Sequence, residues 1–129
     1  MSVVKSRSKA ALARRSDCPV ACTLDLLGDR WTLLVVRDLF LGKQRFQEFL
    51  GSPEGIATNI LADRLQRLEH DRMIDRIASE SHEARATYRL TARGATLRSV
   101  MLAMLSWGLE QIPGTSTAAA GRPLPRGPA

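Results

Sequence analysis

Apolar residues recur every three or four positions through most of the chain, and this spacing predicts a mainly helical protein. The pattern predicts four helices before residue 72, over residues 17–28, 31–41, 45–50 and 57–71. The first opens with Asp17 as a capping residue and with Pro19 in its first turn, where a missing N–H costs nothing. A turn over residues 51–55, with one Pro and two Gly, separates the third helix from the fourth.

Beyond residue 71 the apolar period changes from that of a helix to that of a strand. Ile74–Ala78 and Thr87–Leu90 read as two short antiparallel strands, joined by a loose loop rather than a tight turn. Thr91 then caps a predicted long helix that reaches about Gln111. A short helix, a turn, a second helix and a ribbon form the order of a winged helix-turn-helix, so the fold class is mainly α with a small β-ribbon.

The charge pattern divides the chain into a body and two tails. Of the 19 Lys and Arg residues, five lie in residues 1–15 without any acid and two lie in 115–129, so the net charge of +6 belongs to the tails. We predict a flexible basic N-terminal arm over 1–16, a DNA-binding and dimerisation domain over 17–112, and a disordered Pro/Gly-rich tail over 113–129.

Several classes of protein are disfavoured by the composition. The longest apolar run, Val100–Leu105, is far too short to span a membrane, and we expect a cytoplasmic protein. Cys18 and Cys22 are the only cysteines, and the two histidines show no ligand spacing with them, so we expect neither a metal nor a cofactor. No arrangement of nucleophile, base or paired carboxylates stands out, and we expect no enzymatic activity.

Several short motifs follow one another between about residues 18 and 110, namely Cys18-Pro19-Val20-Ala21, Leu24–Leu34, Arg45-Phe46, Glu48-Phe49, Gly55-Ile56, Asn59-Ile60-Leu61, Asp63-Arg64-Leu65, Leu68-Glu69, Tyr88–Thr91, Gly94 and Trp107-Gly108. Their order and spacing resemble HxlR-type (DUF24) transcriptional regulators, which are related to MarR proteins. This resemblance implies a homodimeric bacterial DNA-binding regulator whose first and last helices form the dimer, with an N-terminal cysteine that often senses oxidants or electrophiles. Ala57 stands where the family often has Ser, which leaves Thr58 as the expected helix cap.

The fourth helix is the predicted DNA-reading helix. Its Ile and Leu residues share an inward face, and the opposite face is polar, with side chains of the types that pair with base edges. The base-reading candidates are Thr58, Asn59, Asp63, Gln66 and Arg67. Arg64 lies at the margin of the inward face, where an internal salt bridge and a DNA contact are equally plausible. Candidates for phosphate and wing contacts are Lys43, Arg45, Arg64, Arg76, Arg85 and Arg89, although a solvated surface is the usual role of a single arginine.

The last helix is apolar on too many sides for one small core, which favours a face buried against a second copy. The expected dimer residues are Val20, Leu24, Met101, Met104, Leu105 and Trp107, and such a dimer implies a palindromic operator. Cys18, at a helix start where backbone amides favour a thiolate, is the candidate redox sensor, and a small packed apolar residue is the alternative. A small-molecule effector is also compatible with the sequence.

Two other functions remain open from the sequence. One is a dimeric ligand-binding or protein-interaction module on a winged-helix scaffold that does not read DNA specifically. The other is non-specific polyanion binding by the two basic tails.

Overall fold

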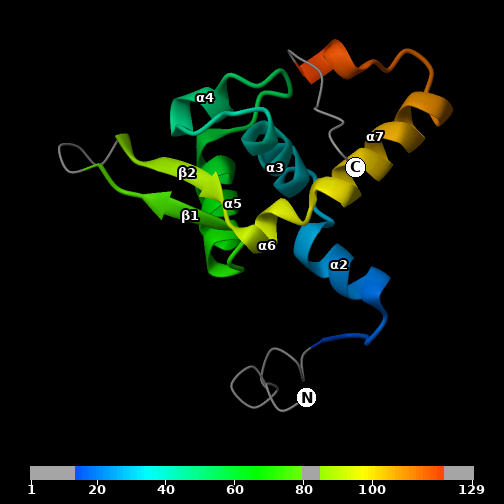
Figure 1. The fold of residues 1–129 in the computed structure, drawn as a ribbon, viewed down its shortest axis with the longest axis horizontal. Coiled ribbons are helices and arrows are strands. Elements are labelled where there is room, and N and C mark those ends of the chain that lie inside the picture. Colours follow the sequence, from blue (N-terminus) through cyan, green and yellow to red (C-terminus); the bar gives the residue numbers. More distant parts are fainter. Residues whose placement is uncertain (1–13, 80–84, 121–129) are drawn as a thin grey trace. The chain divides into compact units, whose positions relative to one another are not determined.

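A computed structural model describes residues 14–79 and 85–120, and the chain divides into two compact units, residues 1–30 and 31–129. The first unit contains helix α2, Pro19–Leu27. The second unit carries the remaining elements (Figure 1), which are α3 Thr32–Phe40, α4 Phe46–Leu50, α5 Thr58–His70, β1 Ile74–Ile77, β2 Thr87–Leu90, α6 Ala92–Ala95, α7 Arg98–Gln111 and the 3-10 turn η3 Thr117–Ala120. Among the described helices, none is long and apolar enough to cross a membrane.

The N-cap of helix α2 lies one residue later than expected. Cys18, not Asp17, is the N-cap residue, and Pro19 takes the first helical position as predicted. The Cys18 side chain makes no capping bond, and its backbone N–H instead donates to the Ser16 hydroxyl at 3.0 Å. An exposed ion pair between Arg15 and Asp25, 2.9 Å long, joins the approach segment to the helix.

The core of the second unit lies between α3, α5 and the two-stranded ribbon (Figure 1). The strands pair antiparallel, with Ile74 opposite Leu90 and Ile77 opposite Thr87. The ribbon is also joined to the chain before α4, because the Tyr88 N–H donates to the Gln44 carbonyl at 2.8 Å. The predicted winged helix-turn-helix is therefore confirmed. Its buried apolar side chains include Val36, Phe49, Leu61, Leu65, Leu68 and Ile74.

Both ends of α5 differ from ordinary helix ends. The helix starts at Thr58 and its N-cap is Ala57, which has no side-chain acceptor, so the expected capping by Thr58 is wrong. At the other end, Arg72 adopts a left-handed conformation with φ of 64°. Its N–H donates to the Glu69 carbonyl and the Met73 N–H to the Leu68 carbonyl, which is the bond pattern that glycine usually supports.

The predicted long C-terminal helix is two helices, α6 and α7. Thr91 caps α6 as expected, since its hydroxyl accepts from the Gly94 N–H at 3.0 Å. The helix then tightens, because the N–H groups of Thr96 and Leu97 bond three residues back rather than four. The chain resumes an α-helix at Arg98, so α7 takes a direction of its own, away from the ribbon (Figure 1).

Parts of the predicted tails and loop lie outside the described residues, namely 1–13, 80–84 and 121–129. Within the predicted Pro/Gly-rich tail, the described portion includes the single turn η3.

Candidate nucleic-acid interface

Helix α5 presents the two faces that its sequence predicts. Leu61, Leu65 and Leu68 are buried, with at most 2% of each exposed. All five base-reading candidates, Thr58, Asn59, Asp63, Gln66 and Arg67, are exposed, and so is the small Ala62 between them. Among the described residues, nothing therefore packs over most of the outer face of α5.

Charges on this face are already partly paired within the helix. The Asp63 carboxylate accepts from Arg64 and lies 3.8 Å from the Arg67 guanidinium. The Arg64 side chain is 16% exposed, so it lies at the margin between the buried and polar faces, as its position in the sequence suggests. Asp63 thus pairs with two arginines, and its pair with the exposed Arg67 is weak enough to be exchanged for another partner.

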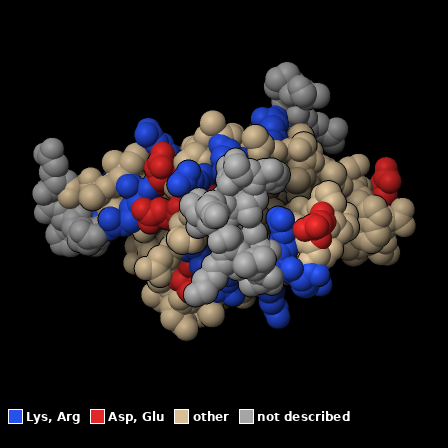
Figure 2. Space-filling model, turned by 90° about the horizontal axis from the view of Figure 1, so that it is seen from below, with Lys and Arg blue, Asp and Glu red and all other residues tan. Residues whose placement is uncertain are grey.

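The ribbon supplies further arginines, of which Arg76, opposite Tyr88, faces α5, whereas Arg89, opposite Asp75, lies on the other face of the ribbon. Arg76 is half-buried on β1, while Arg85 and Arg89 are exposed on or before β2. Arg89 is 3.8 Å from the Asp75 carboxylate on the neighbouring strand. Over the face drawn in Figure 2, Lys and Arg are interspersed with Asp and Glu rather than gathered in one basic patch, as the near-neutral body charge predicts.

A small hollow lies between the outer face of α5 and the ribbon. Its volume is about 160 Å³, and it is lined by Ala62, Leu65, Gln66, Glu69, Arg76 and Tyr88. The Tyr88 ring rests edge-on against Phe49, with 6.3 Å between the ring centroids. The aromatic contact packs the ribbon against α4, and the shared lining of the hollow places Arg76 and Tyr88 beside α5.

A cluster of polar and charged residues joins α3 to the turn before α5, and of its members only Lys43 was singled out from the sequence. The Arg37 guanidinium donates to both oxygens of Glu54 at 2.8 Å and to Asp38 Oδ1 at 2.9 and 3.1 Å. The Ser52 hydroxyl donates to Asp38 Oδ2, and Lys43 Nζ donates to the Ser52 hydroxyl at 2.7 Å. We call these five residues, Arg37, Asp38, Lys43, Ser52 and Glu54, the turn clamp, because they join α3 to the turn between α4 and α5.

The turn clamp is mostly shielded from water. Arg37, Asp38 and Ser52 are buried, at 8%, 3% and 8% exposure. The hydrogen bonds from Arg37 hold the pKa of Glu54 below its ordinary value, and Glu54 and Asp38 raise the pKa of Arg37. A signal was present in the sequence, since Arg37-Asp38 interrupts an otherwise apolar helix.

Two candidates for phosphate contacts, Lys43 and Arg45, precede the first residue of α4. Lys43 is bonded to other side chains of the protein, whereas Arg45 is exposed. Lys43 belongs to the turn clamp, so its ammonium group has partners inside the chain. Arg45 is the exposed N-cap residue of α4. The Glu48 carboxylate accepts from the backbone N–H groups of Gln44 and Arg45, both at 2.8 Å, and these bonds lower the pKa of Glu48. Glu48 therefore already bonds the backbone N–H groups before α4 to which an anion would otherwise bind.

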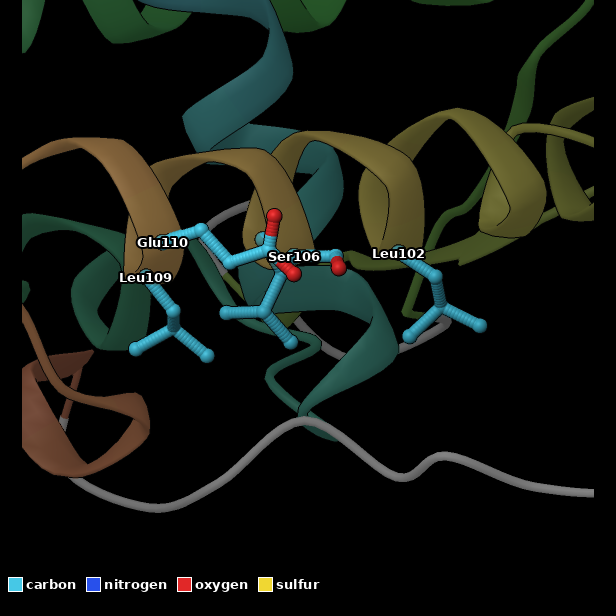
Figure 3. Close-up of a pocket in the computed structure, with 5 residues that line it drawn as sticks. Leu102, Ser106, Leu109 and Glu110 are labelled. Carbon is cyan, nitrogen blue, oxygen red and sulfur yellow. The ribbon is translucent and has the colours of Figure 1, made fainter.

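The expected dimer residues differ in their exposure. Met104 and Trp107 on α7 are 53% and 62% exposed, and Val20 and Leu24 on α2 are 67% and 54% exposed. Leu105 is half-buried, while Met101 is buried within the single chain. A hollow of about 410 Å³ also lies along α7. It is lined by Leu102, Leu105, Ser106, Leu109 and Glu110 (Figure 3).

Both thiols of the first unit are free. Cys18 is exposed, and Cys22 is half-buried with its Sγ 3.2 Å from the Ser16 carbonyl oxygen. Within residues 14–79 and 85–120, no three His, Cys, Asp or Glu side chains converge as they would around a metal ion.

Comparison with known proteins agrees with this architecture. Residues 26–116 match the family model of the HxlR-like helix-turn-helix. The regulator sll1512 of Synechocystis sp., described as an uncharacterized HTH-type transcriptional regulator, is 37% identical over 93 residues, which are 72% of this chain and 69% of that protein. Two relatives from Mycobacterium bovis and Mycobacterium tuberculosis, each 37% identical, are matched over only 59% of their length.

Solved structures of similar sequence share the fold. The crystal structure of PA1607, described as a candidate transcription factor, is 38% identical with a TM-score of 0.71, covering 88% of this chain and 83% of that one. The redox regulator HypR in its oxidized form is 33% identical with a TM-score of 0.66, covering 73% of this chain and 97% of that one. Both likenesses extend over most of the described residues.

Proposed function

The chain belongs to the HxlR-like helix-turn-helix family of transcriptional regulators, and from this premise we propose that it is a homodimer that binds a palindromic DNA operator. Helix α5 enters the major groove, and the ribbon contacts the flanking backbone. The observation that carries the proposal is the exposed polar face of α5 above three buried leucines.

The chemistry of that face suits base recognition. Asn59 and Gln66 offer paired donor and acceptor groups that match adenine, and Ala62 between them allows close approach to the groove. Arg67 reaches a guanine or a phosphate once it leaves Asp63, from which it lies 3.8 Å away. Arg45, Arg76, Arg85 and Arg89 supply phosphate contacts, while Arg64 divides its role between Asp63 and the DNA backbone.

The proposed dimer uses the exposed apolar side chains of the terminal helices. Met104 and Trp107 leave more than half of their surface exposed in the single chain, and so do Val20 and Leu24. Burial of such large side chains against a second copy removes apolar surface from water and provides the two-fold axis that a palindrome requires.

We expect Asn59→Ala and Gln66→Ala each to lower affinity for the preferred operator about tenfold, because each removes one bidentate base contact worth roughly 1–3 kcal/mol. The operator is first selected by the wild-type protein from random duplexes, and affinity is then measured by fluorescence anisotropy at fixed salt. Binding to unselected duplex should change little, since phosphate contacts are kept.

A matched control is Gln111→Ala, which makes the same substitution at an exposed residue of α7, outside the proposed DNA surface. It should bind the operator like wild type. Wild-type protein that enriches no sequence at all, or an unchanged operator affinity in both α5 variants, would contradict specific DNA reading.

Cys18 is the proposed site at which oxidants control binding. It is exposed at the start of α2, and the similar protein HypR is described as a redox regulator. In the proposed step, the Cys18 thiols of two subunits form one disulfide, and the two electrons and two protons reduce one hydrogen peroxide to two waters. The new bond repositions the first helices and thereby the reading helices.

We expect peroxide to release wild-type protein from its operator, whereas Cys18→Ser protein stays bound at the same dose. Cys22→Ser is the control and should respond like wild type, because Cys22 is half-buried against Ser16. The readout is anisotropy together with non-reducing electrophoresis, which detects the linked dimer. Release of Cys18→Ser protein at the wild-type dose would exclude Cys18 as the sensor.

The second candidate function is ligand binding or protein interaction on the same scaffold. The hollow of about 410 Å³ along α7 favours it, because an apolar wall with one carboxylate at Glu110 suits a small amphipathic effector. Calorimetric binding of such a compound by a protein that selects no DNA sequence would favour this function over the first.

A further inference from the structure

The turn between α4 and α5 is bonded to side chains of α3, although no side chain caps the first residues of α5. Ala57, at the N-cap position, offers no acceptor to the N–H groups of the first helical turn. Gly55, two residues earlier, has φ of 71°, a conformation that favours glycine. The direction in which α5 leaves the turn therefore depends on the tertiary contacts of residues 52–56.

Those contacts are made chiefly by the turn clamp. Ser52 is bonded to Asp38 and Lys43, and Glu54 receives two parallel hydrogen bonds from Arg37. Paired bonds of this kind fix both distance and orientation, whereas a single ion pair fixes distance alone. Ile56, buried at 8% exposure, adds an apolar anchor next to the start of α5.

We propose that Glu54 is a positioning residue for DNA recognition, which sets the direction of α5 through its paired bonds to Arg37. The proposal rests on the proposed function of α5. Glu54 itself does not contact DNA, because a carboxylate beside a phosphate backbone is repelled. Arg37 and Asp38, which are buried, act on the interface only through the turn.

A purely electrostatic role for Glu54 predicts the opposite result. Glu54→Gln removes one negative charge close to the proposed DNA surface. If charge alone mattered, this variant would bind every duplex more tightly. If Glu54 instead positions α5, the neutral amide of Gln breaks one of the two parallel bonds to Arg37, and α5 loses its fixed direction. The affinity for the selected duplex then falls, whereas the affinity for a random duplex does not.

The experiment measures affinity for the duplex that the wild-type protein selects and for a random duplex of equal length, across a series of salt concentrations. We expect Glu54→Gln to lower the ratio of the two affinities about tenfold, comparable to the loss of one base contact. Glu54→Asp keeps the charge but shortens the side chain by one carbon, so it should lower the ratio of the two affinities by a similar factor. Asp25→Asn removes one exposed negative charge on α2 and should keep the wild-type ratio.

The possible outcomes separate this proposal from the proposed function. A wild-type protein that selects no duplex contradicts the function itself. A wild-type protein that selects a duplex, with Glu54→Gln equal to it in ratio or tighter on both duplexes, overturns the positioning role. A Glu54→Asp ratio equal to wild type also overturns it, because charge would then suffice. Circular dichroism at the assay temperature verifies that each variant is folded.

Discussion

Replacing Gly94 with alanine is expected to lower the free energy of unfolding by about 3 kcal/mol. A Cβ atom at this position would lie 2.0 Å from the backbone carbonyl oxygen of Met73 and 3.0 Å from a methyl group of Leu90. The oxygen belongs to the backbone and also accepts from the Thr91 N–H at 3.0 Å, so it cannot move aside cheaply. Gly94 is buried and packs α6 against Met73, the residue directly before β1.

Helix propensity alone predicts that Gly94→Ala raises the free energy of unfolding, because alanine is favoured over glycine within a helix by about 1 kcal/mol. Gly108 provides the matched control, since a Cβ there would meet nothing within 4 Å in the single chain. Gly108→Ala should raise stability slightly while Gly94→Ala lowers it, both measured by urea unfolding at one protein concentration. Equal effects in the two variants would contradict close packing at Gly94.

The sequence was sufficient to predict the elements that depend on local pattern. The leucine spacing of α5 defines its two faces because a helix repeats every 3.6 residues, and both faces are found in the structure. Alternating residues likewise predicted the ribbon, and Thr91 predicted the start of α6.

The features that escaped prediction depend on contacts between distant residues. The separation of α6 from α7 occurs at Thr96 and Leu97, whose N–H groups bond three residues back, while the close contact of Gly94 with Met73 packs α6 against a residue 21 positions earlier. The role of Lys43 follows from Ser52, nine positions away, whose hydroxyl it reaches. A single exposed arginine and a clamped one look alike in sequence, so the division of the basic residues between DNA and internal partners required the structure.

Arg37→Met is expected to lower the free energy of unfolding by about 3–5 kcal/mol, because it removes the nearer of the two cations that pair with the buried Asp38 carboxylate. Among the described residues, Asp38 would keep the Ser52 hydroxyl and Lys43, whose Nζ lies 3.8 Å from its carboxylate. Glu54 would lose both of its 2.8 Å bonds. Methionine fills much of the same volume, so the loss measures charge and hydrogen bonding more than packing. Urea unfolding followed by circular dichroism gives the value.

The same substitution at an exposed arginine separates burial from charge. Arg89→Met removes a guanidinium that is 65% exposed and 3.8 Å from Asp75, so its cost should stay below about 1 kcal/mol. Adding Asp38→Asn to Arg37→Met should recover part of the loss, since a neutral amide costs less to bury than an unpaired carboxylate. An Arg37→Met cost no greater than that of Arg89→Met would mean that the turn clamp does not stabilise the fold. The turn would then be fixed by the apolar anchors Phe49 and Ile56 alone.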